Sequence, residues 1–227
     1  MRKKSHMKSQ VKHYRHIHRR KFIGYAAGSI LLLSTMLWAS PAVQAQAQQD
    51  PLMKSSSMSR ADLYKSLQEG GLVIYFRHGR TNKGGVDNIE WPREQQRLLS
   101  EQGEAQSRRI GVAFKQHDFA VGEVLSSPFA RCHDMAVIAF GKTQDKMELL
   151  GILSESSGRD ARAEYSIKLV NQAVPLGQNR IIVGHSSNIR ESTGESVGEG
   201  DAVVLRSSTK GTQVLAVLSP EDWDTLQ

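Results

Sequence analysis

The sequence has a single cysteine, Cys132, in 227 residues. A disulfide within the chain is therefore excluded, and the fold must be held together by its hydrophobic core alone. Histidine is also scarce after residue 21. The remainder of the chain has only four, His78, His117, His133 and His185. No two of these have H-E-x-x-H or a similar metal-binding spacing, so we expect no metal ion and no other cofactor.

Acidic residues are absent from residues 1–21, which contain nine of the 30 lysines and arginines. The remainder has 21 basic and 23 acidic side chains, so the net charge of +7 comes from the N-terminus. Because the rest of the chain is close to neutral, we expect no nucleic-acid partner.

The basic segment is followed by eighteen uncharged, mostly apolar residues, 22–39, and then by Ser40-Pro41 and several small residues. This order of a basic, an apolar and a small-residue region is typical of an export signal. We therefore predict a signal over residues 1–45, cleaved after Ala45 or Ala47, and a periplasmic or otherwise exported protein.

Two further questions concern this signal. Arg19-Arg20 before an apolar residue resembles the twin-arginine export signal, but His18 stands where Ser or Thr is usual, so ordinary Sec export stays open. An uncleaved anchor also stays open, because eighteen apolar residues are about the fewest that span a bilayer. Contact with a membrane is expected only through this segment, and only if it is not cleaved.

The part after the signal divides into a linker and one domain. Residues 46–58 are rich in Gln, Ser and Ala without periodicity, which is typical of a linker. Residues 59–227 are enough for one domain with a full core. In this domain, strands are expected at 72–76, 121–125, 147–153 and 181–184 and as a hairpin of 201–206 and 212–218, with helices at 59–69, 100–117, 128–140, 160–174 and 188–193 and a last one opening at Pro220. This alternation predicts an α/β fold, a three-layer α/β/α sandwich with a mixed, mostly parallel sheet.

The first of these strands leads directly into Arg77-His78-Gly79. A β-branched apolar run that ends in this way is typical of a buried strand that presents its last residues at the C-terminal edge of a sheet, where α/β proteins bind ligands. Arginine is a permanently charged clamp for anions, histidine offers a nitrogen nucleophile, and glycine lets the backbone pass close to a ligand. The three residues together predict a phosphate site.

Two later segments are arranged similarly. Ser126-Ser127-Pro128-Phe129-Ala130-Arg131 follows a second strand, and Gly184-His185 ends another. The three motifs, in this order, resemble the histidine phosphatase (phosphoglycerate mutase-like) superfamily, and the resemblance covers residues 71 to 218. This chain departs from the family just after Arg131, where Cys132 replaces the usual Ala and Met135 the usual Thr. We expect Cys132 to be a buried apolar residue, because its thiol is not needed as a nucleophile.

The resemblance implies a role for each residue of the motifs. His78 would attack the phosphorus atom and become a phosphohistidine, while Arg77 and Arg131 would clamp the phosphoryl oxygens. His185 would donate a further hydrogen bond to these oxygens. The positive charges nearby would lower the pKa of His78 and keep its ring nucleophilic at neutral pH. Arg80 has two interpretations, an extension of the phosphate site or a solvated loop residue.

The proton donor for the leaving oxygen is the least defined part of this prediction. Family members often have a Leu-x-Glu segment after the arginine-bearing helix, and Leu153-Ser154-Glu155 matches it, so we select Glu155. Asp87 and Glu90, in the polar 82–97 loop, are the alternatives. The paired serines, Ser126-Ser127, are expected to be a strand end and a helix N-cap and not nucleophiles, because no base is placed for them.

The sequence thus predicts an exported, metal-independent phosphomonoesterase, with a small-molecule or envelope-sugar phosphate ester as its substrate. A non-catalytic phosphate or phospho-glycan binding protein on the same fold is the alternative from another class. A phosphomutase is a third possibility, which export disfavours because it separates the protein from glycolytic substrates.

Overall fold

The computed structural model describes residues 55–56, 58–154, 157–209 and 211–226. The predicted export signal, most of the predicted linker and the selected proton donor Glu155 lie outside these ranges. Within them, no helix is both long enough and apolar enough to cross a membrane.

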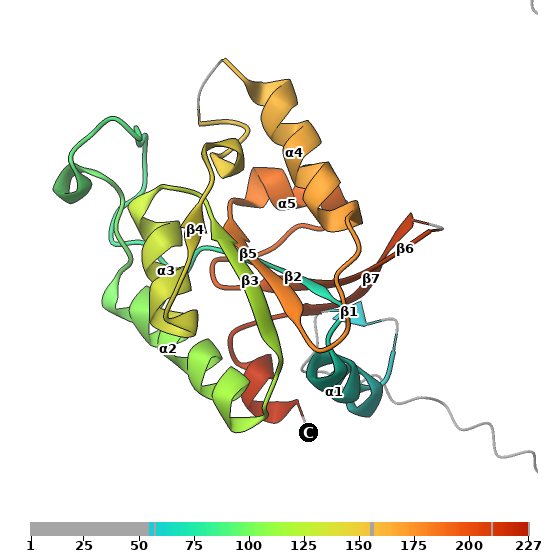
Figure 1. The fold of residues 1–227 in the computed structure, drawn as a ribbon. Helices are drawn as coiled ribbons and strands as arrows, with labels where there is room; N and C mark the ends of the chain where they lie inside the picture. Colours follow the sequence, from blue (N-terminus) through green and yellow to red (C-terminus); the bar gives the residue numbers. More distant parts are fainter. Residues whose placement is uncertain (1–54, 57, 155–156, 210, 227) are drawn as a thin grey trace, which may run out of the picture. The chain divides into compact units, whose positions relative to one another are not determined.

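The centre of the fold is a seven-stranded mixed sheet (Figure 1). Across the sheet the strands are, in order, β1 (Ser55–Ser56), β7 (Gly211–Leu218), β6 (Ala202–Ser208), β2 (Val73–Arg77), β5 (Asn179–Gly184), β3 (Val121–Ser126) and β4 (Gln144–Asp145). The strands β2, β5, β3 and β4 are parallel, whereas β6, β7 and β1 pair antiparallel. The predicted parallel core and C-terminal hairpin are therefore both present.

Helices cover both faces of this sheet because side chains of its five longer strands point into two hydrophobic clusters, one on each face. In β2, Ile74 and Phe76 point into one cluster, and Val73 and Tyr75 into the other. The first cluster contains residues of α1 (Arg60–Glu69), α2 (Glu101–Gln116), α3 (Ala130–Phe140) and the 3-10 helix η3 (Asp222–Thr225), and the second those of α4 (Arg159–Asn171) and α5 (Ser186–Thr193). Figure 1 shows these two layers on opposite sides of the strands. The predicted three-layer sandwich is confirmed.

Two helices begin at the predicted serine N-caps. The side chains of Ser59 and Ser100 accept hydrogen bonds from the backbone N–H groups of Asp62 and Gly103. Such caps are local patterns, which is why the sequence predicts them well.

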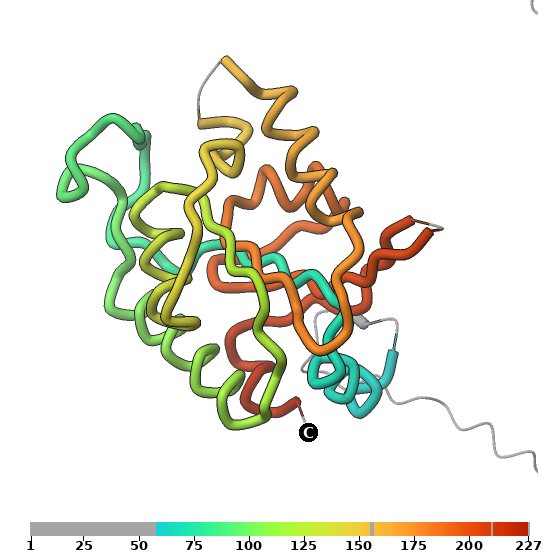
Figure 2. Tube along the Cα trace, viewed as in Figure 1, coloured from blue at the N-terminus to red at the C-terminus, as the bar shows by residue number. Residues whose placement is uncertain are grey.

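The start of α3 differs from the prediction. The helix begins at Ala130, so Pro128 precedes its first turn instead of opening it. Its N-cap, Phe129, has no capping side chain, and the Ala130 N–H donates instead to Oε1 of Gln96, 3.0 Å away. Gln96 belongs to the 82–97 loop, which also contains the 3-10 helix η1 (Arg93–Gln95). In Figure 2 this loop projects outward beside α3 before it returns to α2.

The strand predicted at residues 147–153 is wrong. Met147–Leu149 forms a 3-10 helix, η2, and the short β4 lies just before it. Leu149 and Leu150 are buried whereas Met147 is exposed. The 3-10 turn therefore places the two leucines in the core without pairing to a neighbouring strand. The predicted C-terminal helix is the 3-10 helix η3.

Candidate active site

The register of the parallel strands brings the three motifs to one edge of the sheet. Arg77 at the end of β2 lies opposite Gly184 at the end of β5, and Val183 of β5 lies opposite Ser126 at the end of β3. Two backbone hydrogen bonds continue this pairing past the strand ends. The N–H of His78 donates to the carbonyl oxygen of Gly184 at 3.0 Å, and the N–H of Ser127 donates to that of Val183 at 2.9 Å. The residues that follow the three strands are His78, His185 and Ser127. Segments far apart in the sequence therefore meet as predicted.

His78 is almost completely buried, with 4% of its surface exposed. Its Nδ1 lies 2.9 Å from the carbonyl oxygen of Gly79. Because a carbonyl can only accept, Nδ1 carries the proton and Nε2 keeps its lone pair. Burial, and then the positive charge of Arg131, lowers the pKa of His78 to about 3. The ring is therefore neutral at physiological pH, the state that a nitrogen nucleophile needs.

Arg131 lies in the first turn of α3 and is also buried. Its Nη2 is 3.3 Å from Nδ1 of His185, and its Nη1 forms an ion pair with the carboxylate of Asp87. The guanidinium carbon lies 4.4 Å from the centre of the Phe129 ring. These contacts fix the guanidinium plane, while its Nε–H is buried and has no hydrogen-bond partner among the described residues.

Arg77 completes the pair of predicted phosphate clamps. Its Nη1 donates to the carbonyl oxygen of Val197 at 3.0 Å, and its Nη2 lies 3.7 Å from Oε1 of Glu199. Its Nε–H, like that of Arg131, is buried without a partner in the part of the chain that the structure describes. A buried unpaired donor is costly, and an anion that accepts from both groups would remove this cost.

His185 lies beside His78, with the ring centres 5.6 Å apart and the rings nearly edge to face. Its Nε2 is 2.9 Å from Oγ of Ser127. Burial, and then the charge of Arg131, holds the pKa of His185 well below its usual range. The prediction of Ser127 as an N-cap is wrong, because the serine contacts His185 while Phe129 occupies the cap position. Only the register between β3 and β5 could have indicated this contact.

Two charged residues of the site were missed by the sequence analysis. Glu199 has one carboxylate oxygen 3.7 Å from Arg77 and 3.8 Å from Arg97, and its other oxygen is 4.0 Å from Arg80. Arg97 also donates to the hydroxyl of Thr81 at 2.8 Å. Burial, followed by the charge of Arg131, lowers the pKa of Arg97. Neither residue belongs to a motif, so no local pattern indicated them.

The charges of this cluster fit one phosphomonoester group. Four guanidinium groups face two carboxylates, which leaves an excess of two positive charges while both histidines are neutral. A phosphate monoester carries about −1.5 to −2 at neutral pH. The cluster comprises Arg77, Arg80, Arg97, Arg131, Asp87 and Glu199.

Gly79 has a packing role in this structure. A Cβ atom at Gly79 would lie 2.9 Å from the carbonyl oxygen of Gly103, and one at Gly103 would overlap the backbone of Arg80. The backbone N–H of Arg80 also donates to Oε1 of Gln106, at 2.9 Å. The motif therefore passes directly over the start of α2, and the approach of Gly79 to a ligand stays a prediction.

The two alternative proton donors lie in different environments. The carboxylate of Asp87, with 6% of its side chain exposed, pairs with Arg131 and accepts from the backbone N–H of Arg97 at 3.1 Å. Its oxygens are therefore engaged as hydrogen-bond acceptors. Glu90 is exposed to solvent. Because Glu155 lies outside the described residues, the donor stays a prediction.

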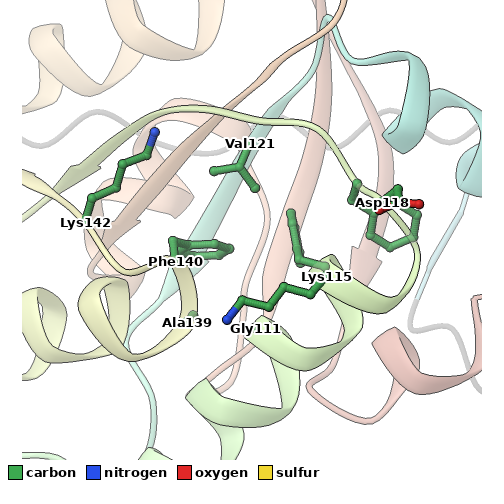
Figure 3. A pocket seen from close by; sticks show the side chains of 9 residues that line it. Gly111, Lys115, Asp118, Val121, Ala139, Phe140 and Lys142 are labelled. Carbon is green, nitrogen blue, oxygen red and sulfur yellow. The ribbon is translucent and has the colours of Figure 1, made fainter.

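A cavity of about 500 Å³ lies near the C-terminal end of α2, whereas the motif at Gly79 packs on the start of this helix (Figure 3). It is lined by apolar residues and glycine, by two lysines, Lys115 and Lys142, and by one acidic residue, Asp118. Both lysines stand where α2 and α3 end, and helix C-termini favour cations, so their charges have a structural explanation. None of the predicted site residues lines this cavity. Among the residues with a described placement, no group of three or more His, Cys, Asp or Glu could hold a metal ion.

Comparison with known proteins identifies the family. Residues 73–199, more than half of the chain, match the sequence profile of the histidine phosphatase superfamily (branch 1). The chain belongs to this superfamily. No curated protein sequence matches it.

Solved phosphatase structures are similar to this chain. The protein histidine phosphatase SixA, complexed with tungstate, has a TM-score of 0.50 and 16% identity, covering 66% of this chain and 98% of that one. A mutant phosphoserine phosphatase from Entamoeba histolytica in complex with phosphoserine has a TM-score of 0.49 and 13% identity, with the same coverage. SixA from Agrobacterium tumefaciens has a TM-score of 0.47 and 19% identity, again over 66% of this chain and 98% of its own.

For this member of the superfamily, burial of His78 has a cost at low pH. The unfolded chain protonates His78 at about pH 6.5, whereas the folded chain does so only near pH 3. The unfolded state therefore gains protons first, and the stabilisation that is complete above pH 6.5 is lost as the pH falls. Between pH 7 and pH 4 we expect His78 alone to lower the free energy of unfolding by about 3 kcal/mol.

Urea unfolding of the wild type and of His78→Asn at both pH values measures this contribution. Asparagine keeps an N–H donor for the Gly79 carbonyl but does not titrate, so its loss of stability should be smaller by about that amount. Equal losses in the two proteins would contradict the prediction.

Proposed function

We propose that the protein is an exported, metal-independent phosphomonoesterase that works through a phosphohistidine on His78. The observation that carries this proposal is the neutral, buried imidazole of His78, beside two guanidinium groups whose Nε–H donors have no partner among the residues that the structure describes. Membership of the histidine phosphatase superfamily supports phosphatase activity.

The reaction then has two steps. Nε2 of His78 attacks the phosphorus atom and the bond to the leaving oxygen breaks, while Arg77 and Arg131 hold the phosphoryl oxygens and stabilise their charge. An acid, for which we keep Glu155, gives its proton to the leaving oxygen. Water then attacks the phosphorus atom and gives a proton to the carboxylate that the acid has become, while the bond between phosphorus and Nε2 breaks. This releases inorganic phosphate and restores both the imidazole and the acid.

The substrate is proposed to be a single phosphate ester on a small molecule or an envelope sugar. The excess of two positive charges supports one phosphate dianion in the cluster. The proposal of an envelope sugar is based on the predicted export signal, and not on a contact in the structure.

Turnover of p-nitrophenyl phosphate by the purified full-length protein in EDTA tests this function. We expect turnover that EDTA does not reduce, and a phosphoryl group on the protein that is labile in acid and stable in alkali after rapid quenching. Activity that disappears in EDTA and returns with a divalent cation would contradict the mechanism.

A non-catalytic phosphate-binding protein is the second candidate. A binding protein of this kind would lack a proton donor for the leaving oxygen. The surroundings of the two alternatives to Glu155 favour it, since Asp87 is ion-paired with Arg131 and Glu90 is exposed to solvent. Phosphate binding measured by calorimetry, without any turnover of aryl phosphates, would support this candidate instead.

A further inference from the structure

The hydroxyl group of Ser127 is the principal hydrogen-bond partner of Nε2 of His185. The serine is completely buried, and its backbone N–H donates to the carbonyl oxygen of Val183 at 2.9 Å, which ties it to β5. Its Oγ lies 2.9 Å from Nε2 of His185. The Sγ atom of Cys132 lies farther away, at 3.8 Å, and burial raises the pKa of this thiol to about 12. The thiol is therefore a neutral, weak partner.

The contacts of His185 determine which nitrogen carries its proton. Nη2 of Arg131 lies 3.3 Å from Nδ1, and a guanidinium group can only donate. Nδ1 must therefore present its lone pair, which leaves the proton on Nε2. Nε2–H then donates to Oγ of Ser127, so each ring nitrogen has one partner of the correct kind.

We propose that Ser127 is a positioning residue that fixes the Nε2–H tautomer of His185. Without its oxygen, Nε2–H would be a buried donor with only the weak thiol nearby, and the opposite tautomer would direct an Nδ1–H against the guanidinium of Arg131. Ser127 thus keeps the proton on Nε2 and leaves the lone pair of Nδ1 to accept from Arg131.

This inference rests on the proposed function for its consequence in the reaction. When a phosphoryl dianion binds to Arg131, its charge offsets that of the guanidinium, and a phosphoryl oxygen replaces Nδ1 as the acceptor of Nη2–H. Nδ1 then takes up a proton from solvent, and the imidazolium donates to a phosphoryl oxygen. The other proton remains on Nε2 and is still held by Ser127, so no proton has to leave the buried side of the ring.

The tautomer can be measured by ¹⁵N NMR of the full chain with labelled histidine, in the absence of phosphate. The His185 signals are assigned by their loss in His185→Gln. We expect a protonated Nε2 and an unprotonated Nδ1 in the wild type, and a shift toward the other tautomer in Ser127→Ala. A wild-type ring with its proton on Nδ1 would overturn the proposal, whether or not Ser127→Ala folds.

Ser126→Ala is the matched control. Ser126 is the neighbouring residue and is equally buried, but its hydroxyl donates to Oδ1 of Asp145 at 2.6 Å. We expect kcat/KM for p-nitrophenyl phosphate to fall about tenfold in Ser127→Ala and to stay unchanged in Ser126→Ala. Equal effects of the two variants, with His185 unchanged in both, would mean that Ser127 is only structural. If the wild type shows no turnover, the proposed function fails, and the NMR result still decides the tautomer.

Discussion

His78→Ala should reduce kcat for p-nitrophenyl phosphate by about 10³-fold or more, because it removes the atom that we propose forms the covalent intermediate. Phosphate should still bind, because Arg77 and Arg131 keep their Nε–H donors and His185 is unchanged. The measurements are steady-state kinetics and calorimetric titration with inorganic phosphate. The quenched variant should also carry no phosphoryl group.

His133→Ala is the control for this prediction. His133 lies on the same helix as Arg131, but its ring is half exposed and pairs with Asp145, 2.9 Å away. It should retain wild-type kcat. If His78→Ala kept more than about a tenth of the wild-type kcat, another residue would have to be the nucleophile.

Arg131→Ala should lower both activity and stability, for different reasons. Loss of the buried guanidinium removes charge stabilisation at the phosphoryl oxygens, for which we expect a fall of about 10²- to 10³-fold in kcat/KM. It also leaves the carboxylate of Asp87 buried without its cation. Breaking a buried ion pair in this way should lower the free energy of unfolding by about 3–5 kcal/mol.

The double variant Arg131→Ala with Asp87→Asn separates the two effects. Removal of the unpaired carboxylate should restore much of the stability, measured by urea unfolding, because an uncharged amide is less costly to bury. It should not restore kcat/KM. Recovery of activity together with stability would show that Arg131 acts only in folding.

The sequence was sufficient for the framework of the site. The apolar runs that end at Arg77 and Gly184 and the serine caps of α1 and α2 are local patterns, and each forms as predicted. The convergence of the motifs follows from parallel strands that end at one edge. The apolar run at 147–153 was misinterpreted because a buried 3-10 turn and a short strand have similar composition.

The side-chain contacts within the site could not be predicted, because they depend on residues distant in sequence. Glu199 meets Arg97 only after the chain has formed β3, β4 and β5, and the Gln96 side chain replaces the expected cap of α3. The contact of Ser127 with His185 depends on the register between two strands. The export signal and the role of Glu155 stay predictions.

The ends of β2, β5 and β3 are joined to one another through main-chain hydrogen bonds, and the side chains of His78, Arg131 and His185 are nearly immobilised by burial. Little conformational entropy is therefore left for these groups to lose when an ester arrives. In the reaction that we propose, the free energy of their contacts with the phosphoryl group is then available for the transition state, instead of being consumed in ordering these side chains.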